Sequence, residues 1–356
     1  MKYALAIDWL ALYCQSETGQ INQYLPRYGF VIAPHGTRQF RQLITVTLDG
    51  RDLFEVQQVP CSNILKPRTL IVKVCNRFLY AGSLFFLLNR FLEENHLQVL
   101  NISRLDICAD FNTFANNLQP ILLIKKFLSA EFRHIGRGIG SAYFNHFAKK
   151  ENEYSRSYLN YTGLSFGSNE SSARAYLYNK SFELMTVKDK PYIKDFWKEC
   201  GLTNTPTCPV WRLEISIKSK GMRFVDKSTK QEVTISGELI EQKDMLSLVF
   251  HTFAKSLFSF VRNHSAIKNI TREPRIELFN GEPALIRTVL CKKSAGNRTE
   301  RILIKQLWQL SQVYSGNEIV EDEGITKILA AELAHCTGLT EWLGNKKDTW
   351  ETPKRK

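Results

Sequence analysis

Hydrophobic and polar positions alternate over much of the first 80 residues, which is the pattern of half-buried strands. The run at 43–48 ends at Asp49 and Gly50, a pair that favours a tight hairpin turn. A β-branched strand is expected at 69–74. The spacing then changes and predicts a helix over 83–94, with Ser83 as its N-cap.

Segments with the spacing of strands and segments with the spacing of helices continue to alternate along the chain. Further strands are expected at 103–111, 171–178 and 210–218. Further helices are expected at 120–130, 191–200, 238–263, 298–314 and 325–343. We therefore predict an α+β fold with an antiparallel sheet and flanking helices. Its first domain covers 1–230, and a mainly helical C-terminal region covers 231–356.

The chain is strongly basic, with 48 Lys and Arg against 35 Asp and Glu and a net charge of +13. Such a surface attracts polyanions, nucleic acid first and anionic membranes second; the alternative is a charge that serves solubility. No apolar run reaches ~18 residues, and Asp8 interrupts the apolar start, so neither a membrane span nor a signal peptide is predicted. The 8 Cys form no CxxC pair, which indicates a reducing, cytoplasmic setting.

The expected strand RLDICADF carries two acidic residues. Period two places Arg104, Asp106 and Asp110 on one face. Two carboxylates there are costly to bury without a partner, and Mg²⁺ or Mn²⁺ would offset that cost. The alternative is that Asp106 pairs with Arg104 while Asp110 is solvated at the strand end.

The expected strand WRLEISIK places Arg212, Glu214, Ser216 and Lys218 on one face. If this strand neighbours the one that carries Asp106, Glu214 can complete a metal site. The alternative is an ordinary, half-exposed strand.

A third segment, ARAYLYNKSFE, offers a nucleophile. Tyrosine has a pKa of about 10, so its phenolate needs stabilisation at neutral pH. In an extended segment, Arg174, Tyr176, Tyr178 and Lys180 share one side, and the ammonium of Lys180 can stabilise the phenolate of Tyr178. The alternative is that Tyr178 only packs.

Together these motifs resemble a known family. The glycine- and serine-containing hairpin at 162–171, the segment YLYNKSFE, the strands RLDICADF and WRLEISIK and the opening IDWL are similar to the Rep-trans family. That family contains the initiators of rolling-circle plasmids, related relaxases and the initiators of some filamentous phages. The resemblance covers residues 5–220 and implies the fold of replication-initiator nickases.

The resemblance also implies roles for individual residues. Tyr178 is the expected nucleophile, Lys180 is the motif lysine, and Asp106 and Glu214 hold the metal. Asp110 and Glu183 are candidate further ligands. Two departures stand out in this chain: Tyr176 occupies the place of a common arginine, which makes it a rival nucleophile, and no His-hydrophobe-His triplet is present.

The expected partner is single-stranded or melted origin DNA. Arg104, Arg174, Arg212 and Lys218 are candidate phosphate contacts. Arg133 and Arg137 lie in a middle segment that mixes basic and aromatic residues, a combination typical of single-strand binding. A host helicase and a second copy of the chain are candidate partners, and the C-terminal region is expected to serve DNA specificity or self-association.

The predicted function is that of a rolling-circle replication initiator, which nicks and rejoins origin DNA through a 5′-phosphotyrosine intermediate with a divalent metal. Four alternatives remain open. They are a relaxase of a mobile element, a DNA-binding regulator of the same fold without catalysis, a metal-dependent nuclease without a covalent step, and an unrelated α+β protein.

Overall fold

The computed structural model describes residues 2–61, 65–136, 141–144, 163–168, 171–226, 232–263, 273–280 and 286–288. Arg137 and the expected helices at 298–314 and 325–343 lie outside the described residues. Residues Met1–Val289 form one compact unit. The expected boundary at residue 230 stays a prediction, although described residues beyond it pack into the core of this unit.

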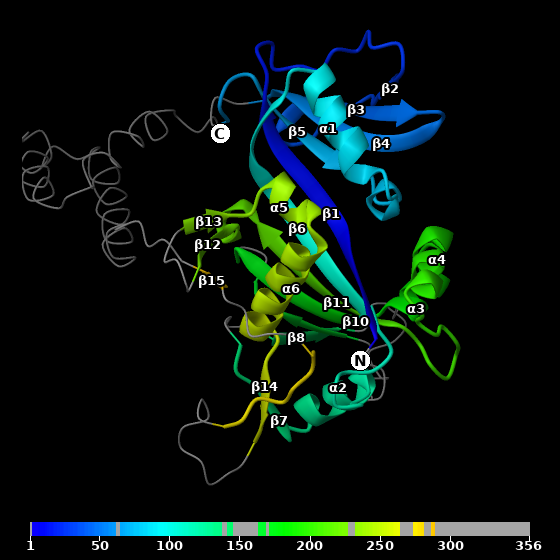
Figure 1. Cartoon of the computed structure of the whole chain (residues 1–356), viewed down its shortest axis with the longest axis vertical. Helices are drawn as coiled ribbons and strands as arrows, with labels where there is room; N and C mark the ends of the chain where they lie inside the picture. The colour runs from blue at the N-terminus through cyan, green and yellow to red at the C-terminus, as the bar shows by residue number, and fades with distance from the viewer. Residues whose placement is uncertain are drawn as a thin grey trace, which may run out of the picture. The chain divides into compact units, whose positions relative to one another are not determined.

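A ten-stranded sheet dominates the described part, with strand order β2-β3-β4-β5-β1-β6-β11-β10-β9-β8, and all of its pairings are antiparallel (Figure 1). Its strands are β1 (Tyr3–Gln15), β2 (Gly29–Ile32), β3 (Phe40–Leu48), β4 (Arg51–Pro60), β5 (Thr69–Val74), β6 (Gln98–Phe111), β8 (Ser141–Phe144), β9 (Gly163–Phe166), β10 (Ala173–Asn179) and β11 (Trp211–Lys218). The predicted α+β class with an antiparallel sheet is confirmed.

Helices and two small sheets complete the described part. The helices are η1 (Phe78–Tyr80), α1 (Leu84–Glu94), α2 (Pro120–Leu128), α3 (Lys180–Thr186), α4 (Pro191–Glu199), η3 (Ser219–Gly221), α5 (Gly237–Glu241) and α6 (Lys243–Leu257). The small sheets pair β12 (Arg223–Asp226) with β13 (Glu232–Thr234) and β15 (Ile286–Thr288), and β7 (Phe132–His134) with β14 (Phe260–Arg262).

The hairpin between β3 and β4 forms as the sequence predicts. Leu48 pairs with Arg51, which leaves Asp49 and Gly50 as a two-residue loop. Both have positive φ, 50° and 71°, which is the backbone twist that such a loop requires and that Asp-Gly tolerates.

The two faces of the sheet differ in character. Alternate residues of β1, β6, β11 and β10 are leucine, isoleucine and alanine, and they form one buried cluster with Val249, Phe250 and Phe253 of α6. Helix α6 lies across these strands, and α1 covers the end of the sheet near β4 and β5 (Figure 1). The opposite face of the same strands carries the polar residues, and we call it the polar face.

The helix expected over 238–263 differs from the prediction. It is divided at Gln242 into α5 and α6, and it ends at Leu257. Phe260 then begins β14, which pairs with β7. The apolar residues at the end of this segment are thus buried as a strand, because apolar spacing alone does not distinguish a short buried strand from a last helical turn.

Candidate active site

The polar face is organised by strand register. Strand β11 lies between β6 and β10, so Arg212, Glu214 and Ser216 each have a neighbour on both sides. The three cross-strand rows are Asp110–Arg212–Tyr178, Cys108–Glu214–Tyr176 and Asp106–Ser216–Arg174. The sequence prediction that these residues share a face is therefore correct, and the sheet brings three separate motifs together within a few strands.

Tyr178 lies on β10 in the row at one end of this arrangement and is 5% exposed. Its hydroxyl donates a hydrogen bond to Glu214 Oε2 at 3.0 Å. Lys180 Nζ donates to the same hydroxyl oxygen at 3.5 Å. Burial, followed by the charge of Glu214, raises the pKa of Tyr178 well above its ordinary value. The phenol is therefore held protonated until a group removes its proton.

Lys180 reaches this position in a way that the sequence did not predict. It is the first residue of α3 and not part of an extended strand. The side chain of Asn179 accepts a hydrogen bond from Phe182 N at 3.0 Å and so caps the helix at the point where β10 ends. This cap fixes the direction of Lys180, whose side chain is buried and also contacts Glu183 Oε2 at 2.5 Å.

Glu214 is the group best placed to accept the proton. Burial, together with the negative charges of Asp8 and Asp106, raises the pKa of Glu214 from 4.5 to about 7. Asp106 is also buried, and burial raises its pKa although the Arg104 guanidinium opposes the shift. Arg104 holds Asp106 with Nε–Oδ1 and Nη2–Oδ2 distances of 3.0 and 2.5 Å. The alternative interpretation of Asp106, a pair with Arg104, is thus what the structure shows.

Asp106 and Glu214 are the carboxylates that could hold a divalent cation on the polar face. Among the described residues, no three His, Cys, Asp or Glu side chains group closely enough to hold a metal by themselves. Asp106 and Glu214 nevertheless lie diagonally on neighbouring strands, and their charges repel. Mg²⁺ is often held by one or two carboxylates, with water and phosphate oxygens in the remaining positions. This pair fits such a site once Arg104 releases Asp106.

Asp110 and Arg212 correct two expectations. Both oxygens of Asp110 are engaged, by Arg212 at 2.7 Å each and by Trp197 Nε1 at 2.6 Å. Asp110 is therefore neither a solvated residue nor placed as a metal ligand. Arg212 is completely buried and also donates to Asp8 Oδ1 at 2.6 Å, so it is not placed to contact a DNA phosphate. The buried charges of Asp110 and Arg212 stabilise each other, because either charge would be costly to bury without the other.

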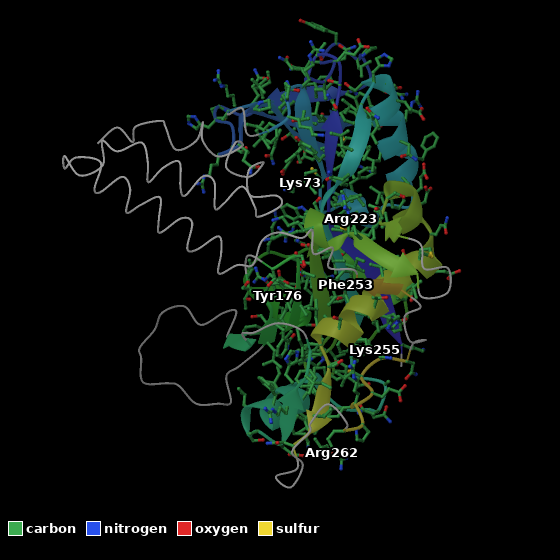
Figure 2. The ribbon with its side chains drawn as sticks, turned by 90° about the vertical axis from the view of Figure 1, so that its left-hand side faces the viewer. Lys73, Tyr176, Arg223, Phe253, Lys255 and Arg262 are labelled. Atoms are coloured by element: carbon green, nitrogen blue, oxygen red, sulfur yellow. The ribbon has the colours of Figure 1, made fainter. Side chains whose placement is uncertain are left out.

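The remaining predicted residues lie in three places: on the polar face, on β7 and on α3. Tyr176 is half-buried opposite Glu214, and the Arg174 guanidinium lies 4.5 Å from its ring centre; Figure 2 labels Tyr176 on the sheet. Lys218 pairs with Arg104 at the end of the polar face and is exposed. Arg133 lies on β7, in a separate two-stranded sheet, so the structure does not bring it to the polar face. Glu183 contacts Lys180 and shares no sheet row with Asp106 or Glu214.

Asp8 is a site residue that was not predicted from the sequence. The pairing of β1 with β6 shifts between Ile7 and Trp9, and Asp8 is the extra residue of this bulge. A bulge redirects a side chain, and Asp8 Oδ1 accepts hydrogen bonds from Arg212 and from Tyr80 at 2.9 Å. Burial opposes its ionisation, but Arg212 and Lys180 hold the pKa of Asp8 well below its ordinary value. An acidic residue inside an apolar strand was the available signal.

The sequence matches no protein-family model, and no curated protein matches it. Among solved structures, a rolling circle replication initiator protein from Geobacillus stearothermophilus is similar. The two chains are 15% identical, the match covers 77% of this chain and 92% of that chain, and the TM-score is 0.45. At this level of similarity the match assigns no activity to this chain, which has to be inferred from its own residues. None of the described helices is long and apolar enough to cross a membrane.

Proposed function

We propose that this protein nicks and rejoins single-stranded DNA through a tyrosine-linked intermediate, as an initiator of rolling-circle replication. One observation carries the proposal: the Tyr178 hydroxyl lies between the Glu214 carboxyl group, at 3.0 Å, and the Lys180 ammonium, at 3.5 Å. A nucleophile beside a proton acceptor and a cation is the arrangement that covalent catalysis requires. The net charge of +13 suits a polyanionic substrate.

The reaction follows from the positions of these groups. The Tyr178 oxygen attacks the phosphorus of a DNA phosphodiester, and the bond between phosphorus and the 3′ oxygen breaks. Glu214, which accepts the hydrogen bond of the phenol at 3.0 Å, takes the phenol proton. The released 3′ oxygen takes a proton from Lys180 or from water. The products are a 5′-phosphotyrosine and a free 3′ hydroxyl, and attack by a 3′ hydroxyl reverses the step.

Asp106 and Glu214 would hold Mg²⁺ or Mn²⁺, which supplies a positive charge to the phosphate and to the leaving 3′ oxygen. The other changes fall to residues of this chain. Arg104 has a side chain that is 42% exposed, so it can turn away from Asp106 towards the incoming phosphate. The guanidinium suits that contact because it donates two parallel hydrogen bonds.

The test uses oligonucleotides that tile the DNA of the source element, labelled at the 3′ end so that the label stays with the protein-linked fragment. We expect a labelled band at the mass of the protein that requires Mn²⁺ or Mg²⁺. Tyr178→Phe removes the band, and Tyr176→Phe is the matched control that retains it. Loss in Tyr176→Phe alone would transfer the role of nucleophile to Tyr176. Cleavage without a protein-linked fragment would identify a nuclease that works without a covalent step.

A second candidate is a DNA-binding protein of this fold that has no catalytic activity. The observation that favours it is the burial of Tyr178, which raises the pKa of the phenol. This candidate predicts tight binding to a verified origin with neither cleavage nor a covalent product in the wild-type protein. The same gel therefore separates the two candidates.

A further inference from the structure

A cleft of about 950 Å³ opens next to the polar face. Its lining includes Asp8 and Trp9 of the β1 bulge, Lys73 of β5, and Lys190 and Tyr192 at the start of α4. Asp8 belongs to both places, because its charge also acts on Glu214 and Tyr178. The cleft thus begins where the proposed reaction takes place.

The electrostatic character of the cleft depends on which of its charges are already paired. Four acidic lining residues have cationic partners; the pairs are Asp8–Arg212, Glu55–Lys73, Asp189–Lys194 and Asp195–Lys198. Three of these cations lie outside the lining. The lining also contains Arg51, Arg77, Lys188 and Lys190, against Asp52. The lining itself carries five acidic and five basic side chains, and an anionic ligand would be attracted to the four basic residues that are not engaged in these pairs.

Lys190 is fixed in the lining of the cleft. Its ammonium donates to Asn76 Oδ1 at 3.0 Å, and the Tyr192 hydroxyl donates to the same oxygen at 2.6 Å. Asn76 Nδ2 in turn donates to the backbone oxygen of Asp8 at 2.9 Å. Burial, followed by the charge of Lys180, lowers the pKa of Lys190. An anion placed between these two lysines would relieve their repulsion.

Aromatic rings stand beside the cations. Lys73 Nζ lies 4.2 Å from the centre of the Trp9 ring, and Glu55 Oε2 holds the same ammonium at 2.6 Å. The Tyr192 ring also lines the cleft and is half-buried. Grooves that bind single-stranded nucleic acid combine cations for the backbone with aromatic rings for the bases.

We propose that this cleft binds the single-stranded DNA next to the cleaved phosphate, with Lys190 on the phosphate nearest to Tyr178 and Lys73, which exchanges Glu55 for the ligand, on a phosphate farther along. This inference rests on the proposed function and adds a route for the substrate. It also explains why the start of α4 is tied through Asn76 to the bulge at Asp8: the tie keeps the phosphate contact at a set distance from the nucleophile.

The experiment measures fluorescence anisotropy of a labelled 12-nucleotide oligodeoxythymidylate with the full-length Tyr178→Phe protein, which cannot react. Lys190→Gln and Lys73→Gln are compared in this background. Lys255→Gln is the matched control, because Lys255 is an exposed lysine of α6, on the apolar side of the sheet and away from Lys73 (Figure 2). Each lost phosphate contact is expected to weaken binding about threefold or more and to lower the log–log salt slope by about 0.7.

The expected result is weaker binding for both cleft variants, unchanged binding for Lys255→Gln, and recovery in Lys190→Arg. Unchanged thermal unfolding verifies that each variant is folded. The cleft assignment is overturned if both variants bind the oligonucleotide with the affinity and salt slope of the parent, or if only binding to a duplex is weakened. Failure of the proposed function would give a different result: the wild-type protein would form no covalent product, even if the cleft variants lost affinity for the oligonucleotide.

Discussion

On one face of the central sheet, strands β6, β11 and β10 present leucine, isoleucine and alanine to helix α6, whereas on the other face the same strands present carboxylates, guanidinium groups and two tyrosines. Both faces are buried over the middle of the sheet. The apolar face is stabilised by non-directional burial, in which neighbours of similar volume can replace one another. On the polar face each group depends on a particular partner at hydrogen-bond distance.

The difference shows where stability and chemistry reside. Arg212 connects Asp8, Asp110 and Tyr80 in one buried network. Arg212 is also the cross-strand neighbour of Tyr178, so the network lies beside the proposed nucleophile. Replacing a whole buried ion pair by apolar residues is often neutral, but removing one member leaves an unpaired charge. The charged groups of the polar face thus stabilise one another, and substitution of one of them alone is expected to destabilise the fold.

The largest expected effect is that of Arg212→Ala. Loss of the guanidinium leaves Asp8 and Asp110 buried without a counter-charge, so we expect a loss of about 3–5 kcal/mol in the free energy of unfolding. Urea unfolding at neutral pH measures it. Because Arg212 holds the pKa of Asp8 well below its ordinary value, its contribution through Asp8 is present at neutral pH and fades as the carboxyl group becomes protonated, so the loss should shrink as the pH is lowered. A pH-independent loss would mean that Arg212 acts through packing and that the two faces do not differ in this respect.

A loss of similar size, about 3–5 kcal/mol, is expected for Phe250→Ala on the apolar face, because the change leaves a cavity against the sheet. Here the loss should not depend on pH. Under conditions in which the variant remains folded, the yield of covalent product should equal that of the wild type. A reduced yield in fully folded protein would show that the apolar face also positions the site.

Glu214→Gln separates stability from activity. The folded-state pKa of Glu214 is about 7 against an ordinary 4.5, so the folded protein binds this proton more tightly. The group's favourable contribution is full below about pH 4.5 and is lost as the pH rises through 7. In metal-free protein at pH 8, Glu214→Gln should therefore raise stability by up to about 3 kcal/mol, since each pKa unit corresponds to about 1.4 kcal/mol.

The same substitution should abolish the covalent product, because glutamine cannot accept the phenol proton. Thermal unfolding of metal-free wild type and variant at pH 5 and pH 8 provides the measurement. The stability advantage of the variant should appear at pH 8 and vanish at pH 5. An advantage of the same size at both values would rule out a raised pKa for Glu214.

The smallest effect concerns the cap of α3. Asn179→Ala removes the hydrogen bond to Phe182 N and should cost about 1 kcal/mol in thermal or urea unfolding. Because the cap directs Lys180 towards Tyr178, the rate of covalent product formation should fall as well. Asn179→Asp retains the acceptor and serves as the control. If Asn179→Ala slows nothing, the position of Lys180 is determined by Glu183 instead.

The strands expected at 43–48, 69–74, 103–111, 171–178 and 210–218, the Asp49-Gly50 hairpin and the parity of the polar residues within each strand could be predicted from the sequence, because alternation and turn chemistry are local properties. The division of the segment 238–263 into α5, α6 and β14 could not, since it depends on the pairing of β14 with β7. The sheet order was also out of reach, and it is this order that makes β11 the neighbour of both β6 and β10.

Which side chains can do chemistry, and on which side of each strand they lie, can be inferred from the amino-acid pattern, because the period of a strand is a property of the backbone. Which of these groups pair with one another depends on the folded arrangement of the strands. Asp110 and Arg212 both lie on the polar face, yet they pair with each other and are therefore not placed to bind a metal or DNA. Asp8, displaced by a bulge, joins the site from a distant part of the chain. The physical reason is that the energy of a buried charge depends on its nearest partners, and those partners are brought together by long-range pairing.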